Sequence, residues 1–165
     1  MISNESLTLR PLSVDDTQFV IELRNDPEIS SNLFSDPPLY DFRHYEWLKN
    51  TQNNLDLIII ENGSGDKIGR IYLTDIDFRH QKAEFGIIIK TDMQSKGYGE
   101  AASRILIEYV FSNLPIRKLY LRLFSDNLPA QKLYKKLGFV QEGKFISEYY
   151  KNGKWKDVTR MALVM

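Results

Sequence analysis

Residues 85–90 read FGIIIK, residues 94–99 read QSKGYG and residues 100–111 read EAASRILIEYVF. The first segment has the apolar run of a buried strand, and the third has the spacing of an amphipathic helix. The loop between them holds two glycines and a lysine, in a chain with only nine glycines. Unpaired N–H groups and the helix dipole favour anions at a helix N-terminus, and glycine lets a ligand approach the backbone. This arrangement raises the hypothesis of a phosphate site.

The loop does not match either of the common phosphate-binding motifs. QSKGYG lacks the G-x-x-x-x-G-K-[ST] spacing of a P-loop, and no third glycine completes G-x-G-x-x-G. An ordinary connection between a strand and a helix could have the same composition. The rest of the chain has to decide between a phosphate site and a structural turn.

The composition predicts a single domain spanning residues 1–165. The chain is 42% hydrophobic and 12% aromatic, enough for a sizeable core, and its 165 residues fit one domain. Lys plus Arg and Asp plus Glu balance at 22 each, so the charge points neither to nucleic acid nor to a membrane. The absence of cysteine excludes disulfides, thiol nucleophiles and cysteine metal sites. The opening MISNESLTLRPL has no apolar signal core, and we expect a cytoplasmic protein.

The pattern along the chain predicts a mixed α/β fold in the order β-α-α-β-β-β-α-β-α-β-β. Strands are expected at 6–12, 55–61, 67–76, 82–90, 118–124, 140–150 and 154–164. Helices are expected at 13–26, 41–50, 100–114 and 128–137, with Ser13 and Asp16 spaced as a capping box and Asn127 as a cap. Residues 28–40 should form a loop or a short irregular helix. Asn152-Gly153 predicts a tight hairpin between the last two strands.

Two motifs resemble those of the GNAT superfamily of acyl-CoA-dependent N-acetyltransferases. Gln94, Gly97 and Gly99 match the signature [RQ]-x-x-G-x-[GA], between the fourth strand and the third helix. SDNLPAQKLYKKLGFVQEGK, residues 125–144, is similar to the family's asparagine, helix and YxKxGF segment. The C-terminal KFISEYYKNGKWKDVTRMALVM is similar to the branch of the ribosomal-protein alanine and spermidine acetyltransferases. The resemblance implies a mostly antiparallel seven-stranded sheet, splayed between strands 4 and 5 and flanked by about four helices.

The resemblance assigns the glycine loop to the pyrophosphate of acetyl-CoA, which would be the co-substrate, with no metal. The backbone of the preceding strand would bind the pantetheine arm. Lys96 could add positive charge, although a lysine in such a turn is commonly solvated, and Asn127 could act only as a helix cap. The cofactor-binding residues implied are Ile87, Ile88, Ile89, Gln94, Ser95, Lys96, Gly97, Tyr98, Gly99, Glu100 and Asn127.

Two residues are candidates for catalysis of acetyl transfer. An amine must be neutral to attack a thioester, the oxyanion of the tetrahedral intermediate needs a donor, and the leaving thiolate needs a proton. Tyr134 occupies the family position that donates a proton to the CoA sulfur, although its spacing alone favours a core residue. Glu84 is the candidate base, with a pKa that an apolar strand would raise. The alternative for Glu84 is an ion pair with Lys82 or Arg122.

In the branch that the chain resembles, the first helices and the last hairpin hold the acceptor. Acidic and aromatic side chains there suit a cationic amine, although a solvated acidic loop has the same composition. The acceptor-binding residues implied are Phe34, Asp36, Tyr40, His44, Trp47 and Tyr149, with His44 also a second candidate base. Three functions stay open: N-acetylation of a small amine (polyamine, amino sugar or antibiotic), N-acetylation of a ribosomal protein N-terminus, or acyl-CoA binding without catalysis. The last hairpin could also pair two subunits as a homodimer.

Overall fold

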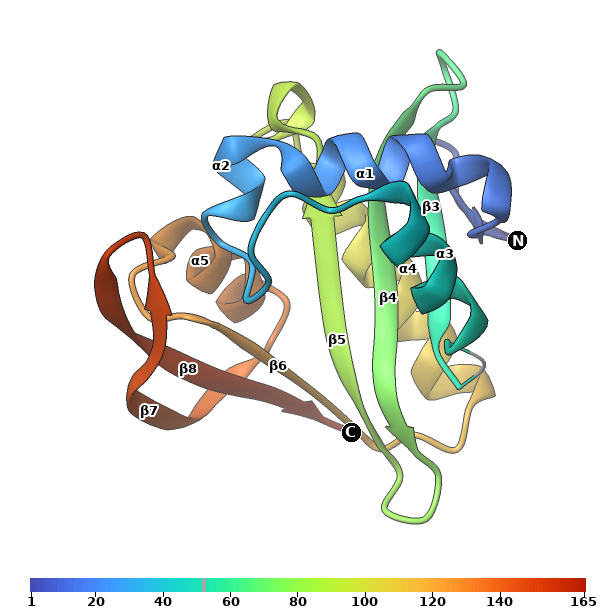
Figure 1. The fold of residues 1–165 in the computed structure, drawn as a ribbon. Helices are drawn as coiled ribbons and strands as arrows, with labels where there is room; N and C mark the ends of the chain where they lie inside the picture. Colours follow the sequence, from blue (N-terminus) through green and yellow to red (C-terminus); the bar gives the residue numbers. More distant parts are fainter. Residues whose placement is uncertain (52) are drawn as a thin grey trace.

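The computed structural model describes residues 1–51 and 53–165 as a mixed α/β fold (Figure 1). Its strands are β1 (Ile2–Ser3), β2 (Leu7–Pro11), β3 (Leu55–Glu61), β4 (Lys67–Asp77), β5 (Lys82–Ile89), β6 (Lys118–Phe124), β7 (Val140–Lys151) and β8 (Lys154–Val164). Its helices are α1 (Thr17–Asn25), α2 (Pro27–Ser30), α3 (Asp41–Lys49), α4 (Tyr98–Asn113) and α5 (Leu128–Lys136), with 3-10 turns η1 (Val14–Asp16) and η2 (Thr91–Met93). Within the described ranges, no helix has the length and apolar character needed to cross a bilayer.

The strands form one sheet in the order β1-β2-β3-β4-β5-β6-β8-β7. All neighbours are antiparallel except β5 and β6, which are parallel. The sequence predicted seven strands, and the eighth is β1, in which Ile2 and Ser3 pair with Leu9 and Thr8. Two residues are too short for an alternating pattern to show, so only the neighbouring strand reveals β1.

Strands β5 and β6 separate along their length. They pair only where Lys82–Glu84 faces Lys118–Tyr120, whereas β5 stays paired with β4 as far as Ile89. Figure 1 shows the two strands close at one end and far apart at the other. The splay expected between the strands at 82–90 and 118–124 is therefore confirmed, and it leaves one edge of β5 open.

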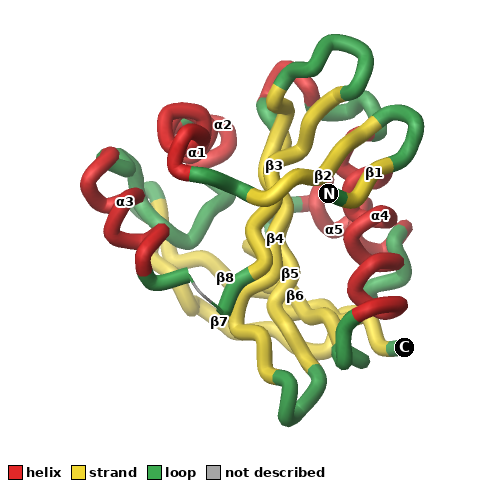
Figure 2. Tube along the Cα trace, turned by 90° about the vertical axis from the view of Figure 1, so that its right-hand side faces the viewer, coloured by secondary structure: helices red, strands yellow, loops and turns green. Residues whose placement is uncertain are grey.

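Helices cover both faces of the sheet (Figure 2). Helices α1, α2 and α3 lie on one side, and α4 and α5 lie on the other. On the α4 side, the fully buried Leu106 belongs to the same apolar cluster as Ile71 of β4. On the opposite side, Leu23 of α1 and Ile29 of α2 pack in a smaller cluster with Ile88 of β5. The alternation of side chains along the strands supplies both clusters.

The ends of α5 and of the last hairpin are formed as the sequence predicts. The Asn127 side chain accepts a hydrogen bond from the Ala130 N–H at 3.3 Å and caps α5. Gly138 follows that helix with a φ of 96°. Asn152 and Gly153 have φ values of 52° and 78°, which suit the tight turn between β7 and β8.

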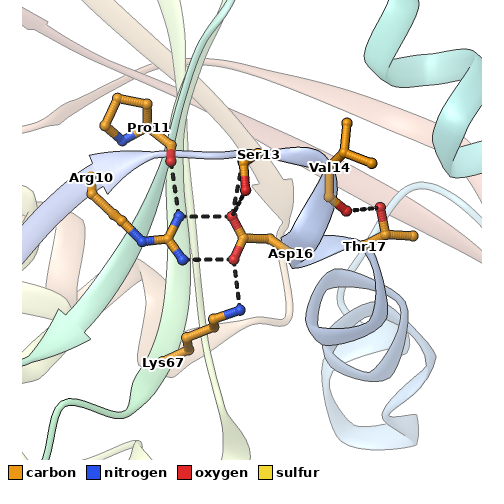
Figure 3. A network of polar contacts seen from close by, with 7 residues as sticks. All are labelled: Arg10, Pro11, Ser13, Val14, Asp16, Thr17 and Lys67. Carbon is orange, nitrogen blue, oxygen red and sulfur yellow. Dashed lines mark hydrogen bonds and ion pairs between the residues drawn. The ribbon is translucent and has the colours of Figure 1, made fainter.

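A buried carboxylate joins the start of the first helix to the sheet (Figure 3). Asp16 is fully buried and pairs with Arg10 of β2 and with Lys67 of β4, each at 2.7 Å. Its carboxylate also accepts the Ser13 N–H at 2.9 Å, which confirms the predicted capping box. Burial opposes ionisation of this carboxyl, but the hydrogen bonds from Arg10 and Lys67 outweigh it and hold the Asp16 pKa well below its usual range.

Candidate active site

A cleft of about 390 Å³ opens where β5 and β6 separate. Beyond Glu84, the edge of β5 that faces β6 has no strand partner within residues 1–51 and 53–165, and Ile87–Ile89 line the cleft there. The other walls include residues of the glycine loop and the stretch of α5 from Asn127 to Tyr134. An unpaired strand edge can bind the amide groups of an extended ligand. The cleft can therefore hold a chain that contains peptide-like groups.

The glycine loop closes this cleft at the N-terminus of α4. Gly97 has a left-handed φ of 85° and is the N-cap, so the helix begins at Tyr98, earlier than the predicted residue 100. The Ala101 N–H donates to the Gly97 carbonyl at 3.0 Å. The N–H groups between these two residues are the orphan donors of the helix start. No atom lies within 4 Å of the position that a Cβ on Gly97 would occupy, so the loop is open to a ligand.

The charges beside the loop also suit an anion. Glu100 lines the cleft, but its carboxylate pairs with Arg104 at 2.8 Å and with Lys136 at 2.5 Å. The negative charge of Glu100 is therefore compensated, and the helix dipole adds partial positive charge. The Gln94 side chain donates to the Ile89 carbonyl at 3.0 Å and joins the loop to the end of β5.

A second cavity, of about 340 Å³, lies between the sheet and the helices α1 and α3. Its walls include Arg24 of α1, Trp47 of α3, Arg70 of β4 and Arg122 of β6. Side chains from four separate elements therefore converge on one space. Glu84 of β5 also lines this cavity, and among the described residues it is the only carboxylate that does so.

One glycine on β5 makes room for an aromatic wall of this cavity. Arg70, Tyr72 and Thr74 alternate along β4 and line the cavity together, because alternate side chains share a face of the sheet. Gly86 stands opposite Tyr72 in the register of β4 and β5. A Cβ at Gly86 would lie only 2.3 Å from the Tyr72 ring, so the ring can lie over this position only because it is glycine.

The cleft and the cavity meet at Tyr134, which lines both spaces. This residue belongs to α5, on the opposite side of the sheet from α3, and it reaches the cavity where β5 and β6 separate. Its ring packs edge-on against Phe85 and Phe139, with centroid distances of 6.3 and 5.8 Å. Burial raises the pKa of the Tyr134 phenol, so the hydroxyl keeps its proton at physiological pH.

Glu84 stands at the point where β5 and β6 part, since it faces Tyr120 in the last paired position of these strands. Arg122 donates to its carboxylate through Nε at 2.8 Å and through a second nitrogen at 3.2 Å. The sequence left two roles open for Glu84, that of a catalytic base and that of a partner in an ion pair. The structure shows the ion pair with Arg122 and also places the carboxylate in the wall of the cavity.

This geometry can hold a long anionic ligand in the cleft and a smaller molecule in the cavity, with a protonated phenol where they meet. The sequence profile of the acetyltransferase (GNAT) domain matches residues 6–140 of the chain. The chain belongs to the GNAT acetyltransferase family. It is 33% identical to the spermidine N(1)-acetyltransferase of Vibrio cholerae, over 98% of this chain and 94% of that protein. It is 29% identical to a putative ribosomal N-acetyltransferase of Bacillus subtilis, over 98% of this chain and 92% of that protein.

Solved structures agree with this membership. The spermidine N-acetyltransferase from Vibrio cholerae in complex with CoA and spermine superposes with a TM-score of 0.92, at 31% identity over 98% of this chain and 96% of that one. A dodecameric structure of the same enzyme gives a TM-score of 0.84, at 31% identity over 98% and 95% of the two chains. This GNAT protein is therefore an acyltransferase, an N-acetyltransferase that uses acetyl-CoA, and the resemblance found in the sequence is confirmed.

Most of the residues predicted to bind acetyl-CoA lie around the cleft. Lys96 and Tyr98 are not among its lining residues: Lys96 is exposed with its Nζ 3.7 Å from the sulfur of Met93, and Tyr98 packs against the apolar core. No cluster of potential metal ligands occurs among the residues that the structure describes. The predicted residues that line the cleft are Ile87, Ile88, Ile89, Gln94, Ser95, Gly97, Gly99, Glu100 and Asn127.

The predicted acceptor residues divide between the cavity and its surroundings. Phe34 and Trp47 line the cavity, and Tyr149 packs against Phe34 with a centroid distance of 4.7 Å. His44 is buried against Trp47, at 5.3 Å between ring centroids, and is not a lining residue. Burial and two nearby arginines lower the pKa of His44.

Asp36 and Tyr40 do not line the cavity. The carboxylate of Asp36 accepts a hydrogen bond from the buried Lys151 Nζ at 3.0 Å. Tyr40 is exposed and stacks on Phe42 with a centroid distance of 5.5 Å. The acidic residue that suggested a cationic acceptor is thus engaged by a lysine of the last hairpin.

Sequence reasoning missed Arg24, Arg70 and Tyr72 as residues of the cavity. A signal was present on β4, where the polar groups of Arg70, Tyr72 and Thr74 alternate with the apolar Ile71 and Leu73. Arg24 gave no comparable signal, because an arginine in the last turn of a helix normally interacts with solvent and with the helix dipole.

Proposed function

We propose that the protein acetylates the primary amine of a small molecule, by direct attack of the amine on the thioester carbonyl of acetyl-CoA. The observation that carries this proposal is the position of Tyr134, which lines both the cleft and the cavity. A thioester at that junction would be within reach of an amine from the cavity side. Two substrates held on either side of one phenol need no covalent enzyme intermediate, in agreement with the absence of cysteine.

In the proposed complex the cleft holds acetyl-CoA. The open N–H groups at the start of α4 bind the pyrophosphate, because a helix N-terminus favours an anion. The unpaired edge of β5 at Ile87–Ile89 binds the amides of the pantetheine arm. Asn127 uses its side-chain oxygen to cap α5, which leaves its amide NH₂ group for the ligand. These roles require no metal.

In the proposed reaction the amine nitrogen bonds to the carbonyl carbon, and the tetrahedral intermediate then expels the CoA thiolate. The phenol of Tyr134 gives its proton to the sulfur as the carbon–sulfur bond breaks, and it recovers a proton from solvent. The nitrogen loses its extra proton to the Glu84 carboxylate, directly or through water, because Glu84 lines the cavity in which the amine binds. Glu84 then releases this proton to solvent, so the products are the N-acetylated amine and free CoA, and atoms and charges balance.

The size of the cavity favours a small amine over a protein N-terminus. Its volume of about 340 Å³, lined by side chains from four elements, suits a small molecule. Both kinds of acceptor occur among the related proteins, since one is named for spermidine and another for a ribosomal protein. The alternative of acyl-CoA binding without catalysis is not favoured, because Tyr134 and Glu84 both line the cavity.

The test is release of free thiol from acetyl-CoA in the presence of a panel of amines: polyamines, amino sugars, aminoglycosides, amino acids and short peptides. We expect turnover with at least one class of small amine, and mass spectrometry should show one added acetyl group on the product. Turnover of peptides alone would replace the small acceptor by a protein N-terminus. Tight acetyl-CoA binding with no turnover of any amine would refute the proposed activity.

We also propose that the protein self-associates through its last hairpin. Phe145, Ile146 and Tyr150 of β7 and Trp155 of β8 are large apolar side chains exposed to solvent. Strand β7 is the last strand of the sheet, and an exposed edge with apolar residues favours pairing with a second copy. The related Vibrio cholerae enzyme has a dodecameric structure. Light scattering should give a mass that is a multiple of 19.3 kDa, and a monomer at all concentrations would contradict the proposal.

A further inference from the structure

The cavity opposite the acetyl-CoA cleft is rich in positive charge. Three arginines line it, Arg24, Arg70 and Arg122, against the carboxylate of Glu84. A cavity that receives a simple cationic amine would be expected to have an excess of negative charge in its lining, because like charges at close range repel each other. The charge of the lining therefore indicates which kind of acceptor the cavity binds.

Two of the three guanidinium groups are compensated by carboxylates. Arg122 forms a two-point contact with Glu84, at 2.8 and 3.2 Å. Arg70 pairs with Asp56 at 2.5 and 2.7 Å, and its guanidinium lies over the ring of Trp47 at 4.7 Å and that of Tyr72 at 4.2 Å. The N–H donors of both arginines are therefore mainly bonded to protein carboxylates, and these contacts hold the aromatic side chains in place.

The third guanidinium, that of Arg24, has no carboxylate within ion-pair distance among residues 1–51 and 53–165. Its side-chain hydrogen bond goes to the neutral hydroxyl of Ser35, at 2.5 Å. Burial, and then the positive charge of Arg70, lower the pKa of Arg24, so this arginine is held in the cavity against electrostatic cost. A partly buried cation with unused donors is a binding group for an anion.

Asp56, which pairs with Arg70 and also acts on Arg24 through its charge, does not line the cavity. The Asp36 carboxylate is engaged by Lys151, and Asp41 and Glu46 are exposed residues of α3 that do not line the space. A polyamine placed with one nitrogen at Glu84 would carry its other ammonium groups toward Arg24 and Arg70. Among the described residues, Glu84 is the one carboxylate that lines the space, and Arg122 already engages it.

We propose that the acceptor is an amine that also carries an anionic group, a carboxylate or a phosphate, which binds Arg24 while the amine lies beside Glu84 and Tyr134. The inference rests on the proposed function and names the substrate class of the same site. The guanidinium of Arg24 offers a planar pair of N–H donors, which matches two oxygens of either anion. Leu33 and Phe34, which also line the cavity, provide apolar contact for the body of the molecule between its two charged ends.

The test uses matched pairs of amines in the thiol-release assay. Each pair contains an anion-bearing amine and its uncharged counterpart: an amino acid and its carboxamide, and an amino sugar phosphate and the free amino sugar. Spermidine is included as the cation without an anion. We expect kcat/KM to be about 10- to 100-fold higher for the anionic member of at least one pair, the size of a hydrogen-bonded charge contact. The pair that shows the difference identifies the anion as carboxylate or phosphate.

Variants then connect this preference to Arg24. Arg24→Ala should reduce the ratio of kcat/KM between the two members of the pair to about one, and Arg24→Lys should restore part of it, because lysine keeps the charge but loses the planar pair of donors. Arg43→Ala is the matched control, since Arg43 is an exposed arginine of α3 that does not line the cavity. A purely structural role for Arg24 would lower the rates of both members equally and leave the ratio unchanged.

The outcomes separate this inference from the proposed function. Turnover of spermidine in preference to every anion-bearing amine would overturn the inference and leave the acetyltransferase function intact. If no amine is turned over, the inference is tested by calorimetry, which measures binding of the same pairs to the complex of the protein with CoA. Binding of the anionic member to the wild-type protein and not to Arg24→Ala would then support the inferred anion site but not the proposed acetyl transfer. Equal or absent binding of both members would overturn it.

Discussion

At the scale of single residues, the proposed mechanism depends most on the phenol of Tyr134. Its hydroxyl has no hydrogen-bond partner among the described side chains, and burial raises its pKa, so it holds a proton that it can give to the CoA sulfur. We predict that Tyr134→Phe lowers kcat about 100-fold, the usual contribution of a general acid, and leaves the Kd for CoA unchanged. Steady-state kinetics and calorimetry measure these two quantities.

The phenylalanine variant keeps the ring that packs against Phe85 and Phe139, so its melting temperature should stay close to that of the wild type. An undiminished kcat in such a folded variant would remove Tyr134 from the mechanism and leave solvent as the proton source. A weaker Kd for CoA with unchanged kcat would instead show that the hydroxyl binds the ligand.

Residue roles could be predicted from the sequence only where a residue belongs to a local motif. Gln94, Gly97, Gly99 and Asn127 stand at fixed spacings within single segments, and the structure places all four around one cleft. Arg24 belongs to no such motif. Its significance comes from the absence of a carboxylate partner among the residues that the structure describes, and a missing contact becomes visible only when the surrounding side chains are in place.

At the scale of elements, the proposed binding of acetyl-CoA depends most on the start of α4. Gly97 combines a φ of 85° with open space at its Cβ position. We predict that Gly97→Val weakens CoA binding by about 10-fold or more, because the side chain would occupy that space and a β-branched residue resists the left-handed conformation. The measurement is the Kd for CoA by calorimetry, next to the melting temperature.

Gly65 provides a matched control for this prediction. It has a φ of 76° in the turn between β3 and β4, and its Cβ position is equally open. Gly65→Val should therefore lower stability about as much as Gly97→Val while leaving the Kd for CoA unchanged. An unchanged Kd in folded Gly97→Val would contradict the assignment of the loop to the phosphates.

The long elements follow from their sequence patterns, and the short ones do not. The α4 helix and the hairpin at Asn152-Gly153 appear within a few residues of their predicted bounds, because periodicity and turn chemistry act locally. Strand β1 does not show in the pattern, because it is defined by its pairing with β2. The single-turn α2, which Asp26 caps, overlaps the segment expected to be a loop or short irregular helix.

At the scale of the whole molecule, the acceptor cavity exists only because distant segments meet. Arg24, Trp47, Arg70 and Arg122 come from four elements spread over most of the chain, and none of these segments is distinctive alone. The pairing of Asp36 with Lys151 likewise joins the first and last parts of the sequence. This explains why the family and the co-substrate could be predicted from local motifs, while the charge of the acceptor cavity could not.

The stability of the whole fold toward acid should depend on Asp16, which joins β2, η1 and β4 through Arg10 and Lys67. We predict that Asp16→Asn lowers the free energy of unfolding at pH 7 by about 2 kcal/mol, since two partly buried cations lose their carboxylate. Asp15→Asn, at an exposed neighbouring position, should have little effect. Urea unfolding of the three proteins measures the differences.

The dependence on pH distinguishes the ion pairs of Asp16 from its packing. The folded-state pKa of Asp16 lies below its unfolded value, so its contribution is complete above the unfolded value of about 4 and is lost as the pH falls through the folded value. The difference in unfolding free energy between wild type and Asp16→Asn should therefore shrink steadily below about pH 4, where both proteins lose the effects of their other carboxylates equally. A difference that stays constant from pH 7 to pH 3 would mean that the neutral contacts of Asp16, and not its charge, hold these three elements together.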